Sequence, residues 1–82
     1  MIRLSLNRRI IEALQLDDAD MLASYEMTSV KTNGSRQYFD APADSWQRVV
    51  ESLTYFARHR LESIYTSDVA NLTQRLTKEV QL

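Results

Sequence analysis

Near its middle the chain reads Met27-Thr28-Ser29-Val30-Lys31-Thr32-Asn33-Gly34-Ser35-Arg36-Gln37-Tyr38-Phe39, and this segment holds its only glycine. Asn33-Gly34 fits a two-residue type I′ turn, because both central residues of such a turn need a positive φ. β-Branched and aromatic residues, which favour strands, lie on either side of this pair. The pattern predicts a β-hairpin whose strands are residues 27–32 and 35–39.

The segment before the hairpin predicts one short strand followed by one or two short helices. Residues 2–6 alternate between apolar and polar side chains, which is typical of a strand. Asn7 offers an N-cap for a helix over residues 8–16, in which apolar residues return on one face. The acidic segment 17–20 forms either a turn or the start of a second short helix through residues 21–25, because acidic side chains favour helix N-termini.

The segment after the hairpin is expected to be helical. Pro42 lies just beyond the second strand and suits an early helical position. From there onward apolar residues recur at steps of three and four, which predicts an apolar stripe on one helical face. The stripe consists of Trp46, Val49, Val50, Leu53, Phe56, Ala57, Leu61, Ile64, Tyr65, Val69, Leu72, Leu76 and Val80. Residues 66–68 are a candidate break with Ser67 as a new cap, so residues 44–80 form either two helices or one helix of about 55 Å.

These elements together predict an α+β protein with a short N-terminal strand and helix, a β-hairpin, and one long or two consecutive C-terminal helices. The 82 residues are expected to form a single domain, residues 1–82. A domain this small buries only about 60% of the surface that its unfolded chain exposes. Because the chain has no cysteine for disulfides, extra stability is expected from oligomerisation or from unusually good helix packing.

The composition argues against several kinds of chemistry. The absence of cysteine and the presence of one histidine, His59, leave no thiol nucleophile and no zinc site. A single glycine leaves no glycine-rich loop that could cradle a phosphate. We therefore expect no enzyme activity, no cofactor, no metal and no small-molecule substrate, and a small hydrolase built around His59 is the least favoured class.

The hydropathy of the chain predicts a cytoplasmic protein. No apolar run approaches the roughly 20 residues that span a bilayer. Residues 1–9 lack the apolar core of a secretory signal. We therefore expect no membrane partner.

The apolar stripe leads to a prediction about function. Its distal part has about two apolar positions in seven, which is typical of a coiled-coil seam. We expect a non-catalytic protein-interaction module, such as a small adaptor or a regulatory protein, that assembles through this stripe with a protein partner or with a second copy of itself. The predicted partner-binding residues are Trp46, Leu61, Ile64, Tyr65, Val69, Leu72, Leu76 and Val80.

The alternative function is binding of nucleic acid. Ten basic and eleven acidic residues give a net charge of −1, which argues against a general binder of polyanions and leaves room for a local basic patch. Five positive charges near the N-terminus and the hairpin could contact several phosphates. The residues of this predicted patch are Arg3, Arg8, Arg9, Lys31 and Arg36.

The order of elements over residues 3–40 resembles a known DNA-binding half-domain. Residues 3–22 read Arg-Leu-Ser-Leu-Asn-Arg-Arg-Ile-Ile-Glu-Ala-Leu-Gln-Leu-Asp-Asp-Ala-Asp-Met-Leu, a strand and a short helix followed by an acidic loop, and a hairpin comes next. This pattern resembles the swapped-hairpin domains of the AbrB/MazE type. The chain has Asn7, Gln15 and Ala19 where that family has proline, glycine and glycine. The resemblance implies a dimeric transcriptional regulator or antitoxin-like protein that contacts DNA with Arg3, Arg8 and Arg9.

A second resemblance covers the hairpin and the helix that follows it. Residues 28–53, with Val-Lys-Thr-Asn-Gly-Ser-Arg-Gln-Tyr-Phe-Asp-Ala at their centre, are similar to the phage W-type head–tail joining proteins. Members of that family are small virion adaptors that bind other proteins. The resemblance implies a virion-associated protein encoded by a phage or a mobile element.

Overall fold

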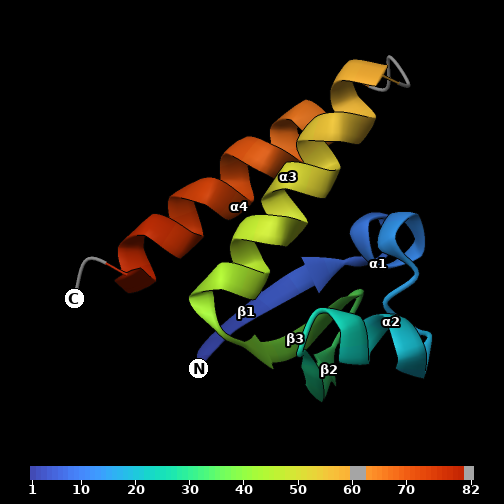
Figure 1. The fold of residues 1–82 in the computed structure, drawn as a ribbon, viewed down its shortest axis with the longest axis vertical. Coiled ribbons are helices and arrows are strands. Elements are labelled where there is room, and N and C mark those ends of the chain that lie inside the picture. Colours follow the sequence, from blue (N-terminus) through green and yellow to red (C-terminus); the bar gives the residue numbers. More distant parts are fainter. Residues whose placement is uncertain (60–62, 81–82) are drawn as a thin grey trace.

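The computed structural model describes residues 1–59 and 63–80, which form three strands and four helices (Figure 1). In chain order the elements are β1 (Ile2–Asn7), α1 (Arg8–Leu14), α2 (Ala19–Ser24), β2 (Thr28–Asn33), β3 (Arg36–Ala41), α3 (Ala43–His59) and α4 (Ile64–Val80). This order confirms the predicted α+β class and settles the C-terminal half as two consecutive helices. None of the described helices is long and apolar enough to cross a membrane.

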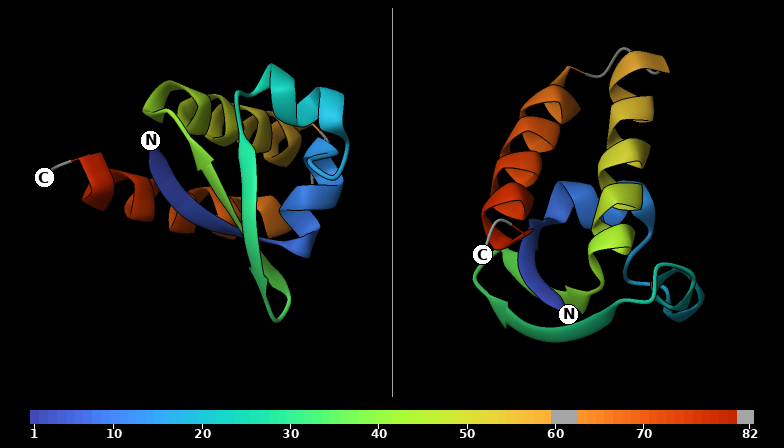
Figure 2. Two further views of the ribbon diagram at one scale, coloured as in Figure 1. Left: turned by 90° about the horizontal axis from the view of Figure 1, so that it is seen from below. Right: turned by 60° about the vertical axis from the view of Figure 1, so that its left-hand side comes forward.

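The three strands form one antiparallel sheet in the order β1-β3-β2. Leu4 pairs with Phe39 and Ser5 pairs with Tyr38. Because successive side chains of a strand point to opposite faces, Leu4 and Phe39 belong to one face and Ser5 and Tyr38 to the other. Both α3 and α4 cover the face of Leu4 and Phe39, and no helix of the described chain covers the opposite face, here called the outer face (Figure 2).

The predicted hairpin is confirmed, but its turn lies one residue further along than predicted. Asn33 and Arg36 are the last paired residues, so the two central residues of the turn are Gly34 and Ser35. Gly34 has a φ of 66°, which glycine adopts without steric cost. Glycine at the first central position is the preference of a type II′ turn rather than of the predicted type I′ turn. Gly34 is therefore the first central residue of the turn and not the second, as the sequence had predicted.

Strand β2 forms an open edge of the sheet. All six of its residues are exposed, and its pairing with β3 shifts register between Ser29 and Lys31. Such a bulge leaves one residue unpaired and bends the strand locally. The opposite edge, β1, lies beside α4 (Figure 2, right).

Short-range caps define the two small helices. The Asn7 side chain accepts a hydrogen bond of 2.9 Å from the backbone N–H of Ile10, which confirms the predicted N-cap of α1. Helix α1 ends earlier than predicted, because Gln15 adopts a left-handed conformation with a φ of 56°. Asp18 caps the second short helix, α2, by accepting bonds from the backbone N–H groups of Asp20 and Met21. This resolves the open alternative at residues 17–20 in favour of a helix.

Helices α3 and α4 run antiparallel, side by side (Figure 2). The predicted break at residues 66–68 is wrong, since these residues lie inside α4 and helix α3 ends at His59. Asp68 does not interrupt the helix because its carboxylate bonds to side chains of β1 and α1 rather than to its own backbone. Residue 61, the predicted partner-binding Leu61, lies outside the described residues.

The core lies between the sheet and the two long helices. Its largest fully buried side chains include Trp46 and Phe39, and the indole N–H of Trp46 donates a bond of 2.9 Å to the backbone oxygen of Ile2. Leu72 and Leu76 of α4 are buried in the same core. The side chains of Trp46, Leu72 and Leu76 are therefore covered by their own chain, which corrects the prediction that they bind a partner. Burial of one such leucine contributes roughly 1.5–3 kcal/mol.

Candidate functional site

The remaining predicted partner-binding residues on α4 fall into two groups, one half-buried and one exposed. Tyr65 and Val69 are half-buried and pack against the core. Ile64 and Val80 are 49% and 58% exposed, but they lie at the first and last residues of the helix. At a rise of 1.5 Å per residue, about 24 Å of helix separates them. The structure therefore does not bring these predicted residues together as one exposed apolar patch.

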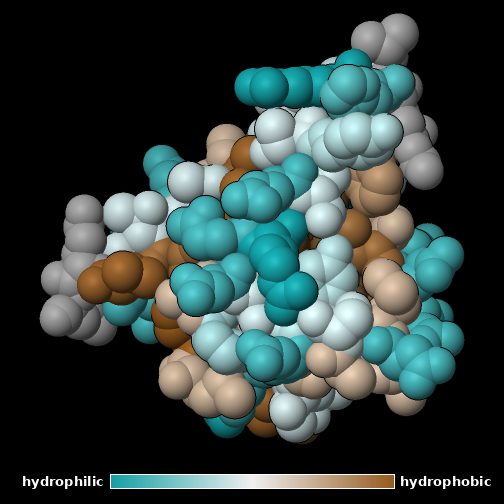
Figure 3. All heavy atoms as spheres, in the orientation of Figure 1, coloured by the Kyte–Doolittle hydropathy of each residue, from teal (hydrophilic) through white to brown (hydrophobic). Residues whose placement is uncertain are grey.

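An apolar groove lies elsewhere, between α3 and the α1–α2 segment. It encloses about 590 Å³, and Figure 3 shows hydrophobic side chains gathered in this region. Its lining residues are Ala13, Leu14, Gln15, Met21, Ser24, Tyr25, Arg48, Glu51, Ser52, Tyr55 and Phe56. This surface, here called the α2–α3 groove, was not predicted from the sequence, because it depends on how α2 packs against a helix that follows it by a whole hairpin.

Polar contacts across the α2–α3 groove fix its two walls relative to each other. The hydroxyl groups of Tyr25 and Ser52 lie 3.1 Å apart. The Arg48 guanidinium lies 5.2 Å from the centre of the Tyr25 ring and donates a bond of 3.0 Å to the backbone oxygen of Ser24. Tyr55 on α3 is 57% exposed and lines the groove. The groove thus combines a fixed shape with an exposed aromatic ring.

Two of the arginines predicted to bind nucleic acid are engaged in ion pairs. Arg3 donates to both carboxylate oxygens of Asp40, at 2.8 and 3.1 Å. These hydrogen bonds raise the pKa of the Arg3 guanidinium and lower the pKa of the Asp40 carboxyl. Arg9 likewise donates to both carboxylate oxygens of Asp68, at 2.9 and 2.7 Å. Each pair is internally neutral, so neither adds net positive charge to the outer face.

Asp68 is the most buried acidic side chain of these pairs, with 8% of its side chain exposed. Burial by itself would raise the pKa of its carboxyl, but hydrogen bonds from Arg9 and Asn7 outweigh that effect and hold the pKa below its ordinary value. The Asn7 amide donates at 3.2 Å while its oxygen caps α1. Asp68 therefore stays ionised at neutral pH as part of the fold.

The other three predicted nucleic-acid residues are Arg8, Lys31 and Arg36. Within the described residues, none of them donates to both oxygens of a carboxylate as Arg3 and Arg9 do. Arg8 lies 3.6 Å from Glu12, and both side chains are largely exposed. The Lys31 ammonium lies 4.8 Å from the centre of the Tyr38 ring on the outer face. Arg8 and Arg36 both line a polar hollow of about 320 Å³ beside the hairpin turn. Arg8 and Arg36 therefore lie near one another beside the hairpin turn, and Lys31 lies over Tyr38 of β3.

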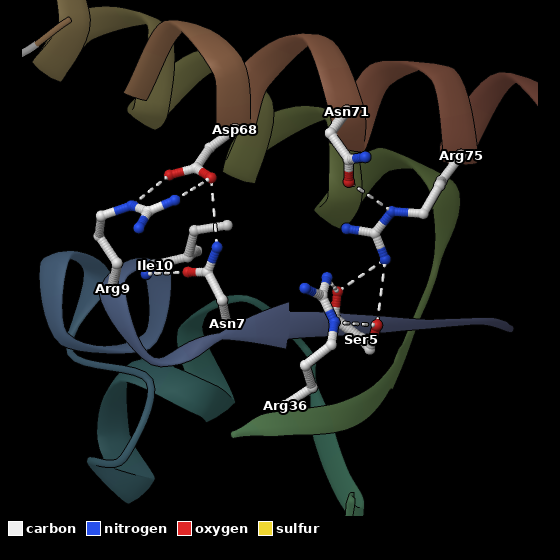
Figure 4. Close-up of polar contacts among 8 residues, drawn as sticks. All are labelled: Ser5, Asn7, Arg9, Ile10, Arg36, Asp68, Asn71 and Arg75. Carbon is white, nitrogen blue, oxygen red and sulfur yellow. Dashed lines mark hydrogen bonds and ion pairs between the residues drawn. The ribbon is translucent and has the colours of Figure 1, made fainter. Parts of the chain in front are cut away.

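Arg36 also takes part in a network that the sequence did not predict (Figure 4). Its Nε donates to the hydroxyl of Ser5 at 3.0 Å, and Nη1 of Arg75 donates to the same hydroxyl at 3.2 Å. Arg75 is oriented by Asn71, whose side-chain oxygen accepts a bond of 2.9 Å from its Nε. Burial and then the neighbouring charge of Arg36 lower the pKa of the Arg75 guanidinium. Two cations therefore converge on one serine.

A sequence signal for this network existed in α4. Asp68, Asn71 and Arg75 recur at steps of three and four, the same spacing that marks Leu72 and Leu76. This spacing predicts a polar stripe that runs beside the apolar one. The identity of the facing strand residue, Ser5, could not be read from the sequence, because it lies 70 positions away.

Metal ligands and known relatives give no further guidance. No group of three or more His, Cys, Asp and Glu residues that could hold a metal occurs within residues 1–59 and 63–80. His59 stacks on Tyr55 with their ring centres 4.3 Å apart.

No protein-family model, curated protein or solved structure matches the chain. The two family resemblances therefore stay predictions.

Proposed function

We propose that this chain is a non-catalytic protein-binding module whose partner docks in the α2–α3 groove. The proposal keeps the class of function expected from the sequence and moves the docking surface from the C-terminal stripe to the groove. The observation that carries it is the combination of an apolar floor with Tyr25, Tyr55 and Arg48 in one groove. Tyrosine and arginine are enriched among residues that dominate protein–protein binding energy.

The shape and charge of the groove favour an amphipathic helix as the docking element. Grooves between helices bind such helices through apolar side chains at steps of three and four. Exposed acids flank the wall formed by α2, at Asp17, Asp18 and Asp20, and Glu51 lines the groove itself. The partner helix is therefore expected to carry basic residues beside its apolar face.

A comparison of two exposed apolar residues tests the proposal. The tagged chain is purified from cells that encode it, as the wild type and as the variants Tyr55→Ala and Ile64→Ala. Tyr55 lines the groove, whereas Ile64 has similar exposure on α4 and belongs to the stripe predicted from the sequence. We expect the protein that co-purifies with the wild type to remain with Ile64→Ala and to be lost with Tyr55→Ala.

The affinity for the recovered partner then gives the quantitative result. Replacing a central aromatic residue of an interface commonly costs about 2 kcal/mol or more, a factor of about thirty in Kd. Isothermal titration with the purified partner should show this loss for Tyr55→Ala and an unchanged Kd for Ile64→Ala. The reverse order of effects would move the docking surface back to α4 and defeat the proposal for the groove.

A further inference from the structure

Arg36 and Arg75 form a pair of like charges with no carboxylate between them. Ser5 accepts bonds from both guanidiniums: from Arg75 at 2.8 Å on its backbone oxygen, and from Arg36 at 3.4 Å on the same oxygen. Its hydroxyl is shared as well. The ion pairs of the described chain join Arg3, Arg8 and Arg9 to acids, so neither Arg36 nor Arg75 has an acidic partner there. Placing two cations on one neutral acceptor is unfavourable unless an anion balances them.

Both guanidiniums keep donors that the protein does not use. Arg36 bonds through Nε and Nη2, and Arg75 bonds through Nε and Nη1. Nη1 of Arg36 and Nη2 of Arg75 make no hydrogen bond within the described residues. Every fully buried side-chain nitrogen and oxygen of these residues has a partner, so the two unused nitrogens are not fully buried. The pair therefore presents N–H donors to a ligand from two directions, one strand and one helix.

The surroundings of the pair add positive charge. Asp68 is close enough for the charge of Arg36 to lower the pKa of its carboxyl, but its own charge is balanced by Arg9. Arg9, Arg36 and Arg75 contribute three positive charges and Asp68 one negative charge, which leaves two positive charges. Lys31 lies one strand further across the outer face, over Tyr38, the residue that pairs with Ser5. The site thus suits an anion with several acceptor oxygens.

We propose that Arg36 and Arg75, held in place by Ser5 and Asn71, bind a phosphate group at the junction of β1, β3 and α4. Guanidinium groups match the oxygen geometry of phosphate and donate to it in pairs. The group comes either from a free phosphate compound or from a nucleic-acid backbone, and in the second case Lys31 and Arg8 contact neighbouring phosphates. This site is separate from the α2–α3 groove and does not depend on it.

The first experiment measures binding of inorganic phosphate at constant ionic strength, with chloride as the replacement anion. Amide chemical shifts in a ¹H–¹⁵N spectrum should show saturable changes around Ser5 and Arg36 for the wild type. Arg36→Gln and Arg75→Gln should each weaken the affinity at least tenfold, and Arg58→Gln, an exposed arginine on α3, should leave it unchanged. The same spectra show whether each variant is folded. Arg36→Lys keeps the charge and loses the paired donors, so it should fall between the wild type and Arg36→Gln.

The second experiment distinguishes the two sources of phosphate by titrating a short fluorescent DNA duplex at several salt concentrations. For a backbone ligand the slope of log K against log salt becomes shallower by about one in Arg36→Gln, because one phosphate contact is lost. If the duplex does not bind while phosphate does, a free phosphate compound is the ligand. Phosphate shifts no larger than those of chloride, or equal affinities in the wild type and both glutamine variants, would overturn the site.

Discussion

Asp68 and Arg75 lie two turns apart on α4, and both side chains reach toward the polar side of β1 (Figure 4). They differ in what balances their charge. The Asp68 carboxylate accepts from Arg9 and Asn7, and Asn7 also caps α1, so one carboxylate ties α4 to the junction of β1 and α1. Arg75 instead covers the backbone oxygen of Ser5 on an edge strand, next to another cation. Asp68 therefore has a structural role, while Arg75 also keeps an N–H donor, on Nη2, that the described residues do not use.

The role of Asp68 predicts both a loss of stability and a change in its pH dependence. Asp68→Asn should lower the free energy of unfolding at pH 7 by about 2 kcal/mol, because hydrogen bonds to a charged group contribute more than neutral ones. The folded state lowers the pKa of this carboxyl, so its contribution is present above the unfolded value of about 3.9 and is lost as the pH falls through the folded value. Urea denaturation between neutral pH and about pH 3 measures the difference between the two proteins.

A matched control separates this effect from a general response to lost charge. Asp17→Asn removes an exposed acid of the α1–α2 loop and should change the free energy of unfolding by less than about 0.5 kcal/mol. The difference between the wild type and Asp68→Asn should shrink as the solution becomes acidic. A difference that stays constant down to acidic pH would contradict an ionised Asp68 in the folded state.

At the scale of elements, α4 packs against the rest of the molecule with two kinds of surface, one apolar and one polar. Leu72 and Leu76 face the core, and Asp68 and Arg75 face the β1 edge. The narrow apolar stripe that suggested a coiled-coil seam is therefore a seam within one molecule, filled by α3 and the sheet. The two large exposed apolar residues of α4, Ile64 and Val80, lie at its ends and do not extend this seam.

Substitutions along α4 should follow this division. Leu72→Ala should lower the free energy of unfolding by roughly 2–5 kcal/mol, because it leaves a cavity in a packed core. Ile64→Ala removes a similar side chain at a half-exposed position and should cost less than about 1 kcal/mol. Chemical denaturation at two protein concentrations checks both values. A midpoint that rises with protein concentration would show that another chain covers the stripe.

The sequence predicted those elements whose signals are local. The Asn7 cap, the hairpin and the strand at residues 2–6 each depend on neighbours a few positions away, and all three are present. The turn shifted by one residue because Gly34 satisfies two turn types equally well at the level of composition. The sequence between α3 and α4 contains no glycine or proline that would mark the end of a helix. The predicted break with Ser67 as a cap was wrong, because Asp68 beside it bonds to side chains of β1 and α1 and remains inside α4. The α2–α3 groove and the Arg36–Arg75 pair depend on long-range packing, which no local pattern encodes.

At the scale of the whole molecule, the described chain covers its own core. Its Cα radius of gyration is 11.9 Å, close to the roughly 12 Å expected for a folded domain of this length. The buried residues of the core come from β1, β3, α1, α3, α4 and the adjoining loops, and Leu22 of α2 packs against them. We therefore expect helix packing, rather than oligomerisation, to account for the stability of this small domain.

The oligomeric state tests this view directly. Light scattering across a dilution series should give the mass of one chain, 9.5 kDa, at every concentration. A constant mass of one chain would contradict the predicted self-association through Trp46, Leu72 and Leu76, which are buried in the core. A stable mass of two or more chains, lost in Val80→Ser or Ile64→Ser, would restore the exposed ends of α4 as an assembly surface.

Strand β2 has a consequence for how the molecule behaves when crowded. An unpaired edge of this kind invites lateral stacking, in which chains add one after another into fibres. The irregular pairing after Ser29 interrupts the row of amide and carbonyl groups, and Lys31 adds a repelling charge beside the interruption. We therefore expect this bulge and the charge beside it to oppose polymerisation of separate molecules through β2.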